Sequence, residues 1–401
     1  MIALRRALVA APFLLLAAAV EARSPALGFR ALVGPPAGAV PMDRADPERS
    51  GRSRASLPAN PKVVWKLRLP GGLSHGVAVD AAGRAVFSHD SPRVTQLAPD
   101  GHVEWTAETG LSAPAAAPVL LSRGTRGVLV EDGHWLGLDR AGRMRFDVAL
   151  PVDGKTPQAV APLPLDTGGA VLAFGGRVFV VGADGSVEAR CRLKDPVATL
   201  SSSNHSITVV TRSGAVFGWS PPVAPGLVAD FGGVPGLNQV ARQGEALVAV
   251  VDRRRLVWLS LRDGRRREIA TAGGNEWLTA PTLAADGTVL SLDGRGLLLR
   301  RPPRGQLERL GLVAGAGARA PSLLGPPLIV DASGRAGFAR ASESFGTVSP
   351  SGTVSPVEGA GCSSPFSVVP AGERAMLVAC QSGWVFKLAD ADARALGDET
   401  R

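Results

Sequence analysis

The stretch RVTQLAPDGHVEW, residues 93–105, has the pattern of two short strands joined by a tight turn. Polar and apolar side chains alternate in its last four residues, as they do in a strand with one face in water. Asp100-Gly101 supplies the residue types that a hairpin turn needs at positive φ. Residues 63–69 alternate in the same way, beginning with Val63 and Trp65. No long stretch after the N-terminal region has the spacing of an amphipathic helix, so we expect an all-β protein.

Glycines that fit the same turn recur along the chain. They are Gly101, Gly142, Gly185, Gly264, Gly305 and Gly352, with spacings of 41, 43, 79, 41 and 47 residues. The longest gap is close to two repeats and contains a Pro-rich stretch, residues 220–226, that takes the place of one turn. A period of about forty residues with four strands in each unit is typical of a β-propeller. One such sheet cannot bury both of its faces, but a ring of stacked sheets can.

Units that begin near residues 72, 113, 158, 197, 237, 278, 318 and 361 give eight blades, and the eighth lacks a fourth strand. Residues 63–69 precede the first complete unit and have the pattern of a fourth strand. We therefore predict a single β-propeller over residues 61–390, with eight four-stranded blades, the last one closed by this N-terminal strand. Seven blades are the alternative, because the seventh unit is irregular around residues 342–355.

The N-terminal 22 residues have the features of a secretory signal peptide. Arg5 and Arg6 precede an apolar run, and Ala22 supplies a small residue for cleavage. We predict cleavage after Ala22 and an exported bacterial protein, periplasmic or secreted, with no transmembrane segment. Residues 23–60 are rich in Pro, Arg, Ala and Ser without periodicity, which predicts a flexible leader. Residues 391–401 are predicted to be a C-terminal tail.

The chain is basic, with 44 Lys and Arg against 35 Asp and Glu and a net charge of +9. Such a surface could attract phosphate-rich envelope polymers or nucleic acid. The arginines, however, are scattered and are not interleaved with aromatic residues, so we expect ordinary surface charge and no nucleic-acid partner. We expect the protein to be a monomer.

Three cysteines are present, Cys191, Cys362 and Cys380. Cys362 and Cys380 are each nine residues from Ala371, which lies in a plausible hairpin turn. Residues at equal distance from a turn face each other across an antiparallel pair, and an oxidising compartment would let them form a disulfide. Two buried free thiols, or a shifted register, are the alternatives. No cysteine spacing fits a zinc site.

Fourth-strand tryptophans after Asp-Gly turns, as in LAPDGHVEW (97–105), and units such as VFVVGADGSVEAR (178–190) resemble the PQQ-like propeller repeat. The resemblance extends over residues 60–390 and implies a family that includes quinoprotein dehydrogenases. It also includes non-catalytic envelope scaffolds, such as the propeller subunit of the outer-membrane β-barrel assembly machine. The dehydrogenases carry adjacent cysteines over the quinone, a calcium site and a catalytic Asp. This chain has no adjacent cysteines and no matching ligand set, so PQQ is not expected. The scaffold's lipid-anchoring cysteine is missing as well.

In a propeller, the loops between blades and those between second and third strands share one face, where binding sites gather. The candidate binding residues on these loops are His75, His89, Asp90, Arg93, Asp132, His134, Asn238, Asp252, Arg253, Trp277, Asp293, Arg295 and Asp331. His75 or His89 with Asp90 could form a general base and its orienting partner, but Asp and Arg beside Gly are also ordinary turn residues. Trp277 is the tryptophan that we expect to face a ligand; the others are expected to pack between blades.

These observations favour a non-enzymatic scaffold that binds a protein or an envelope polymer through its loop face, with no cofactor. The alternative is a metal-dependent hydrolase or lactonase, with calcium held by Asp carboxylates at the channel mouth. No Gly-x-Ser-x-Gly, phosphate-loop or His-Glu-x-x-His motif is present.

Overall fold

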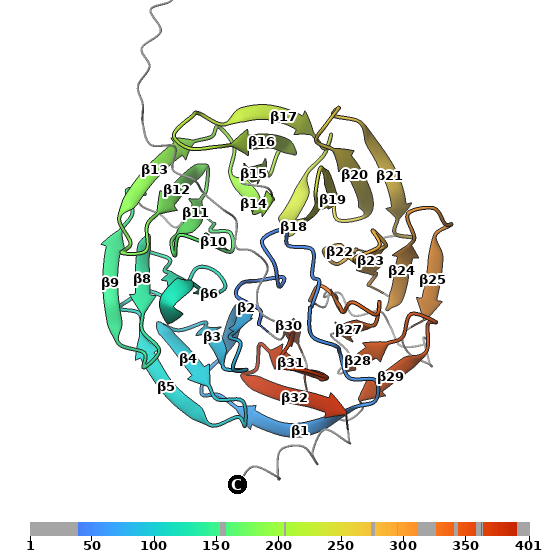
Figure 1. Ribbon diagram of the computed structural model, residues 1–401, viewed down its shortest axis with the longest axis horizontal. Coiled ribbons are helices and arrows are strands. Elements are labelled where there is room, and N and C mark those ends of the chain that lie inside the picture. The colour runs from blue at the N-terminus through green and yellow to red at the C-terminus, as the bar shows by residue number, and fades with distance from the viewer. Residues whose placement is uncertain are drawn as a thin grey trace, which may run out of the picture.

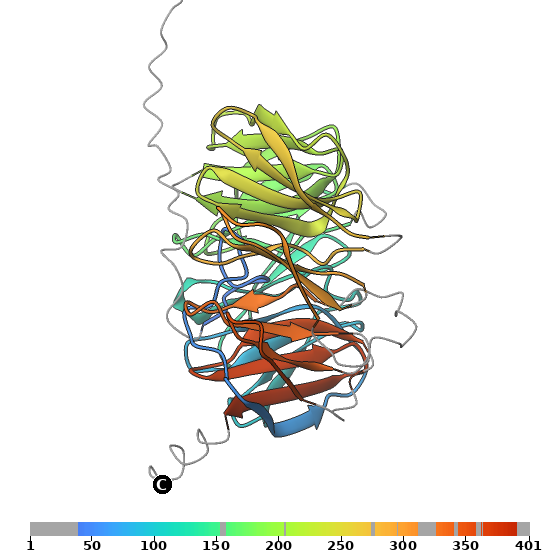
Figure 2. The same cartoon turned by 90° about the vertical axis from the view of Figure 1, so that its right-hand side faces the viewer.

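Eight four-stranded antiparallel sheets stand around a central axis as the blades of a β-propeller (Figure 1). This computed structural model describes residues 39–152, 158–203, 206–273, 277–294, 296–311, 326–340, 344–357, 362 and 364–390. From the side the ring is a disc (Figure 2). The all-β fold and the eight blades are confirmed, and the seven-blade alternative is wrong.

The strands follow one another from the axis outwards in each blade. Blade 1 holds β2 (Leu73–Val79), β3 (Ala85–His89), β4 (Arg93–Leu97) and β5 (Val103–Glu108); blade 2 holds β6 (Val119–Leu120), β7 (Arg126–Leu129), β8 (His134–Leu138) and β9 (Met144–Ala149). Blade 3 holds β10 (Leu163–Pro164), β11 (Ala170–Phe174), β12 (Arg177–Val181) and β13 (Val187–Arg192); blade 4 holds β14 (Val197–Ser203), β15 (Ser206–Thr211), β16 (Ala215–Trp219) and β17 (Gly226–Asp230). Blade 5 holds β18 (Pro235–Gln243), β19 (Ala246–Val251), β20 (Arg255–Ser260) and β21 (Arg266–Thr271); blade 6 holds β22 (Thr282–Leu283), β23 (Val289–Leu292), β24 (Leu297–Arg301) and β25 (Glu308–Gly311). Blade 7 holds β26 (Ile329–Val330), β27 (Ala336–Ala339), β28 (Phe345–Val348) and β29 (Val354–Val357); blade 8 holds β30 (Pro365–Pro370), β31 (Ala375–Cys380), β32 (Trp384–Asp390) and β1 (Pro61–Arg68).

The turns between third and fourth strands are where the sequence pattern places them. The six predicted glycines lie in this turn in blades 1, 2, 3, 5, 6 and 7. The Pro-rich stretch, residues 220–226, joins β16 to β17 in blade 4. The doubled interval in the repeat therefore does contain a complete blade.

The ring is closed by an N-terminal strand, as predicted. β1 pairs antiparallel with β32, and Lys66 lies opposite Phe386 while Arg68 lies opposite Trp384. The ammonium group of Lys66 is 5.7 Å from the centroid of the Trp384 ring. Hydrogen bonds between the two ends of the propeller thus hold the circle together without a covalent link (Figure 1).

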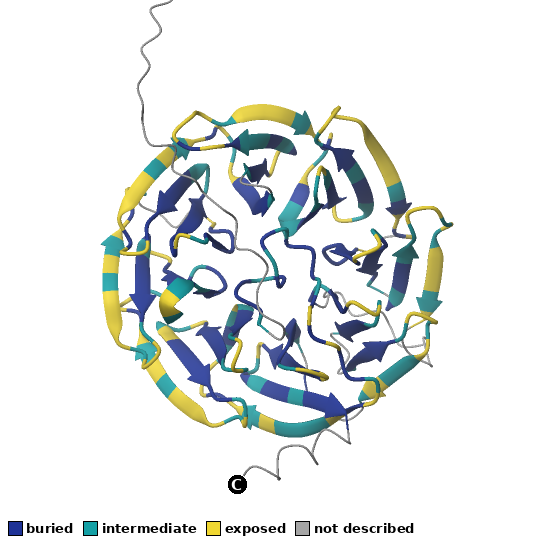
Figure 3. Cartoon of the chain, viewed as in Figure 1, coloured by how far each residue is buried: buried dark blue, intermediate teal, exposed yellow. Residues whose placement is uncertain are grey.

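The core lies between the blades, because each sheet is apolar on both faces. The middle strands β11 and β31 are buried throughout. The fourth strands β5, β9 and β13 alternate between exposed and half-buried residues and form the wet perimeter (Figure 3). This gradient explains why the fourth strands carry the clearest alternation in the sequence.

An aromatic ring from one blade covers the turn glycine of the next at three successive junctions. Trp65 lies against Gly101, and Trp105 lies against Gly142. Each indole donates a hydrogen bond to a carbonyl two residues before that glycine, over 3.1 Å to Pro99 O and 2.9 Å to Arg140 O. Phe146 covers Gly185 in the same manner. A side chain on any of these glycines would collide with the ring, so the turns need glycine for its size as well as for its positive φ.

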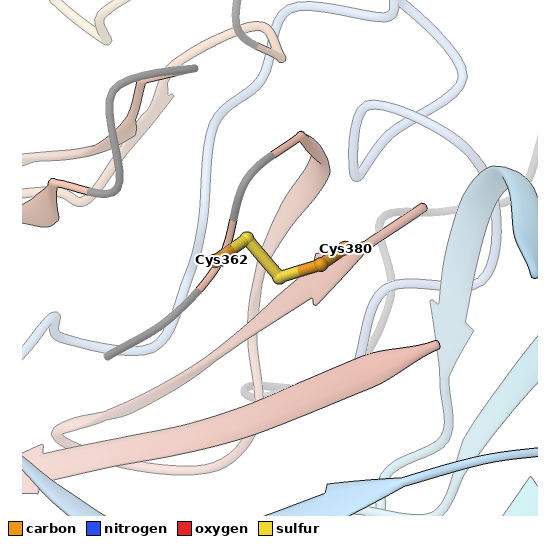
Figure 4. Close-up of a disulfide and its surroundings, with 2 residues drawn as sticks. All are labelled: Cys362 and Cys380. Carbon is orange, nitrogen blue, oxygen red and sulfur yellow. A yellow bond between two sulfur atoms is a disulfide. The ribbon is translucent and has the colours of Figure 1, made fainter. Parts of the chain in front are cut away.

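Cys362 and Cys380 form a disulfide with a Cα–Cα distance of 5.8 Å, so the predicted pairing is confirmed (Figure 4). The geometry differs from the one expected. A bulge near the start of β30 places Pro365 opposite Cys380, and Cys362 lies before the strand. The bridge therefore pins the entry to blade 8 to its second strand, and Cys191 on β13 is the free cysteine.

Residues 39–60, which we call the channel segment, follow the inner edges of the blades at the face that carries the turns between first and second strands. The last residues of the segment then run outwards to β1 (Figure 1). The segment follows the ring in blade order. It bonds to blade 1 through Val40 and Val79, and then its carbonyl groups accept from inner-strand or turn amides of blades 2, 4, 5, 6, 7 and 8. These acceptors are Pro41, Pro47, Glu48, Ser50, Gly51 and Ser56, and the donors are Leu120, Ser202, Arg242, Leu283, Val330 and Arg374. Each of these seven blades thus gains at least one backbone hydrogen bond from the channel segment at an inner edge that an open channel would leave without a partner.

Two arginines of the channel segment also donate to carbonyl groups of blades 3 to 6. Arg49 donates to Leu200 O and Ala161 O in blades 4 and 3, and its side chain is fully buried. Arg44 donates to Val240 O over 3.1 Å and to Pro281 O in blades 5 and 6. Burial lowers the pKa of both guanidinium groups to about 10.

The channel segment corrects a prediction made from composition. Residues 39–60 are ordered against the blades, and all but three of them are buried or half-buried, in place of the flexible leader that their Pro, Arg and Ser content indicated. The predicted signal peptide, the rest of the leader up to residue 38 and the C-terminal tail lie outside the described residues.

Candidate functional site

An exposed tryptophan lies under an arginine at the rim between blades 5 and 6. Trp277, in the connection from β21 to β22, is 39% exposed. The guanidinium carbon of Arg253, in the turn from β19 to β20, is 4.4 Å from the centroid of the indole ring. The backbone joins the two loops, because the Leu278 amide donates to Arg253 O over 2.9 Å. The stacked cation holds the ring in place while leaving part of it open to solvent.

The loop that presents Arg253 has an unfavourable backbone conformation that its surroundings maintain. Asp252 and Arg253 have φ of 52° and 64°, in the left-handed region that non-glycine residues seldom adopt. The Asp252 carboxylate accepts from the Val234 amide over 3.0 Å and also pairs with Arg255. The Arg255 hydrogen bond, followed by that from Val234, lowers the pKa of Asp252, so the carboxylate stays charged.

We call Val234, Asp252, Arg253, Arg255 and Trp277 the rim patch. Val234 is 51% exposed, so the patch presents two apolar side chains beside two cations and one carboxylate. Three of the thirteen predicted residues, Asp252, Arg253 and Trp277, are brought together here. The arrangement can bind an apolar or aromatic group next to an anionic or carbonyl group, but it has no evident nucleophile and base pair.

The histidines of blade 1 have partners other than Asp90. His75 Nε2 is 3.0 Å from Pro114 O, and His89 Nε2 is 2.8 Å from Thr95 Oγ1. Burial lowers the pKa of both histidines. Asp90 favours protonation of His89 through its charge, a smaller effect than burial. The contacts thus give the two rings structural roles and do not form the general-base pair considered above.

Three further predicted residues form exposed pairs at the perimeter. Arg93 Nε is 3.0 Å from Glu108 Oε1. His134 Nδ1 is 2.6 Å from Asp147 Oδ1, and this hydrogen bond raises the pKa of His134. The amide of the same histidine donates to Asp132 over 3.2 Å. Such exposed pairs contribute about 0–1 kcal/mol each to the free energy of unfolding. They belong to blades 1 and 2, whereas the rim patch lies between blades 5 and 6.

The remaining predicted residues serve the backbone or lie elsewhere. Asn238 has a φ of 53° in a bulged part of β18, and its carbonyl lies 3.4 Å from Arg44 Nη1. Asp293 is buried and accepts from the Leu297 amide over 2.8 Å. Asp331 is in the turn from β26 to β27, on the opposite face from the one predicted, because the irregular seventh unit shifted the assignment of its strands. Arg295 lies outside the described residues.

Sequence reasoning missed the residues that fill one end of the channel. Arg44, Ala45 and Arg49 have φ of 64°, 70° and 52°. Asp43, which pairs with Arg49 at 3.6 Å, lies so close to Gly76 that a side chain at that glycine would meet its carboxylate. A segment rich in Arg and Pro gives no local sign of burial, because its partners are carbonyl groups from distant blades.

Within the part of the chain that the structure describes, no three His, Cys, Asp or Glu side chains are grouped as a metal site would require. Over the same residues, no helix has the length and apolar character needed to cross a membrane.

A scan against protein-family models and a search of curated proteins found no match for the chain. Solved structures do match its fold. BamB from Moraxella catarrhalis is 13% identical with a TM-score of 0.54, over 85% of this chain and 96% of that one. The computationally designed Ika8 protein is 12% identical with a TM-score of 0.64, over 80% and 97%. Virginiamycin B lyase from Staphylococcus aureus is 12% identical with a TM-score of 0.50, over 82% and 99%. At these identities the likeness shows the β-propeller fold alone.

Proposed function

We propose that this propeller is an exported, non-enzymatic scaffold that binds a protein or an envelope polymer through the rim patch. The observation that carries the proposal is the exposed Trp277 ring stacked under Arg253 on a loop held at positive φ. Tryptophan and arginine are enriched among the residues that dominate protein interfaces, and a loop fixed in advance binds at a lower entropic cost.

Other features support this function and an extracytoplasmic location. The Cys362–Cys380 disulfide is suited to an oxidising compartment. The PQQ-like repeats resemble a family with envelope scaffolds, and BamB, a solved neighbour, has the same fold. The histidines that could have served as a catalytic base have structural partners instead.

Site-specific photo-crosslinking tests the proposal. A benzophenone amino acid at Val234, 51% exposed within the rim patch, is compared with one at Leu227, 66% exposed on the outer strand of blade 4. In cells that export the protein, we expect a discrete product from position 234 that is absent from position 227. Gel mobility and digestion with protease or glycan hydrolase tell a protein from a polymer.

Substitutions then tie the product to the patch. With the crosslinker at position 234, Trp277→Ala or Arg253→Ala should reduce the yield about tenfold, as removal of an interface anchor does. The matched control is Arg267→Ala, because Arg267 stacks on Trp258 at 5.3 Å without being part of the rim patch. Equal yields from Arg253→Ala and Arg267→Ala would refute the proposal. A large rise in melting temperature with calcium or zinc, and no crosslink, would favour the metal-dependent hydrolase.

A further inference from the structure

The junction between blades 6 and 7 has a leucine where three other junctions have an aromatic ring. Leu310 on β25 covers the turn glycine of blade 7, Gly352, where Trp65, Trp105 and Phe146 cover theirs. Leucine is smaller than these rings, and a cavity of about 230 Å³ lies beside it. It opens on the face that carries the channel segment, opposite the rim patch, and every residue that lines it is described. The strands β24, β25 and β28, which carry part of its lining, are labelled in Figure 1.

The junction between blades 8 and 1 shows the same place occupied by a tryptophan ring. There Trp65 lies against Leu97, Pro99 and Lys387, and no volume is left for a water molecule. The cavity at blades 6 and 7 has Val348, Pro350 and Arg300 in the corresponding places. Its floor is apolar and buried, with Leu290, Leu298 and Ala336, and its mouth carries the exposed Asp286 and Ser333.

The turn carbonyl that accepts from the Trp65 indole also has a counterpart at blades 6 and 7. Pro99 O accepts from Trp65 Nε1 over 3.1 Å and from Lys387 Nζ over 2.8 Å, so one turn carbonyl serves both an indole and a cation. At blades 6 and 7, Pro350 O accepts from Arg300 Nη1, the counterpart of the lysine. A carbonyl oxygen has two lone pairs, and within the described residues Pro350 O accepts from Arg300 where Pro99 O accepts from a cation and an indole.

We propose that this cavity, the blade 6–7 pocket, binds a planar aromatic ring bearing an N–H donor, the indole class, with the N–H donating to Pro350 O. An apolar protein cavity of about 150 Å³ can hold benzene, so the larger volume here suffices for a fused two-ring system. The ring could belong to a tryptophan side chain or to a free indole. The inference does not depend on the proposed scaffold function, because the pocket and the rim patch lie on opposite faces.

Binding of 5-fluoroindole to the full chain, followed by ¹⁹F NMR, tests the pocket. We expect saturable binding at one site, and Leu310→Trp should abolish it by filling the cavity from within. The matched control is Leu227→Trp, which adds the same ring on an exposed strand of blade 4 and should leave binding unchanged. Leu310→Phe, which repeats the Phe146 arrangement, is a second filled variant in case the first does not fold.

Further ligands define the chemistry. N-methylindole, which lacks the donor, should bind about three- to tenfold more weakly than indole, as expected for one lost hydrogen bond. N-acetyltryptophanamide binding with indole-like affinity assigns the pocket to a side chain, whereas binding of indole alone assigns it to a free aromatic. Absence of saturable binding, equal binding by the Leu310→Trp and Leu227→Trp variants, or no preference for indole over N-methylindole would overturn the proposal.

Discussion

Replacing Arg49 with methionine should destabilise the whole ring, because this one fully buried side chain joins three parts of the chain. Its guanidinium donates to Leu200 O and Ala161 O and pairs with Asp43, and the side chain has no exposed surface. Methionine keeps much of the apolar volume but leaves these acceptors without their donor.

The size of the effect follows from these contacts. Hydrogen bonds from a charged donor contribute about 1.5–3 kcal/mol each, so two of them amount to about 3–6 kcal/mol. Burying the charge of this arginine has a cost, which shows in the pKa of Arg49, lowered by burial to about 10. Removing the arginine relieves that cost. We therefore expect a loss of about 3 kcal/mol in the free energy of unfolding.

Urea unfolding followed by tryptophan fluorescence measures this loss. Arg143→Met is the control, since Arg143 pairs with Asp139 while 81% exposed and should change the free energy of unfolding by less than about 0.5 kcal/mol. Hydrogen exchange at the Ser202 amide, which donates to Pro47 O, should accelerate in the Arg49 variant. If Arg49→Met and Arg143→Met unfold at the same urea concentration, the channel segment does not stabilise the ring.

Three other results are expected. Replacing both Cys362 and Cys380 with serine should lower the free energy of unfolding by about 3 kcal/mol in urea titrations, since the bridge closes a loop with a sequence separation of 18 residues; no change would contradict it. Burial raises the pKa of the Cys191 thiol to about 11, so iodoacetamide should label it at pH 8 far more slowly than it labels the unfolded chain, and equal rates would show that the thiol is accessible. Burial lowers the pKa of His89, so its contribution to stability is present above about pH 6.5 and is lost as the pH falls, because the unfolded chain takes up the proton first. His89→Gln should reduce the fall in melting temperature between pH 7 and pH 5. Part of the fall should remain, because burial lowers the pKa of His75 as well, and an unchanged slope would rule out a contribution from His89.

The fold could be predicted from the sequence because its signals are local and repeated. Turns like those at Gly101 and Gly142 recur in six of the eight blades, and each is followed by a fourth strand on the outside of the ring. Closure of the ring could be predicted because the eighth unit lacked a fourth strand and residues 63–69 had the pattern of one. The disulfide was predicted correctly, but the two cysteines do not face each other across the hairpin as expected: Pro365 lies opposite Cys380 in the ladder, and Cys362 reaches Cys380 from the connection before β30.

The site was predicted less completely, because its contacts join loops that are distant in sequence. The loops of Arg253 and Trp277 could each be found from their place in the repeat, but not their stacking at 4.4 Å. Asp331 was placed on the wrong face since the irregular seventh unit hides where its strands begin. Arg44 and Arg49 were missed because what buries them is a set of carbonyls from four blades, which no pattern near residue 40 reveals.

Because β1 pairs with β32, the ring can close only late in the synthesis of the chain. The ribosome makes β1 early and β32 late, and Arg68 finds its neighbour Trp384 only after the intervening residues have emerged. Until then β1 has an unpaired edge, and the backbone groups of the incomplete circle are open to association with other chains. Assembly should therefore be slow, as it is for topologies dominated by distant contacts, and the nascent polypeptide would benefit from protection against aggregation until its last strand arrives.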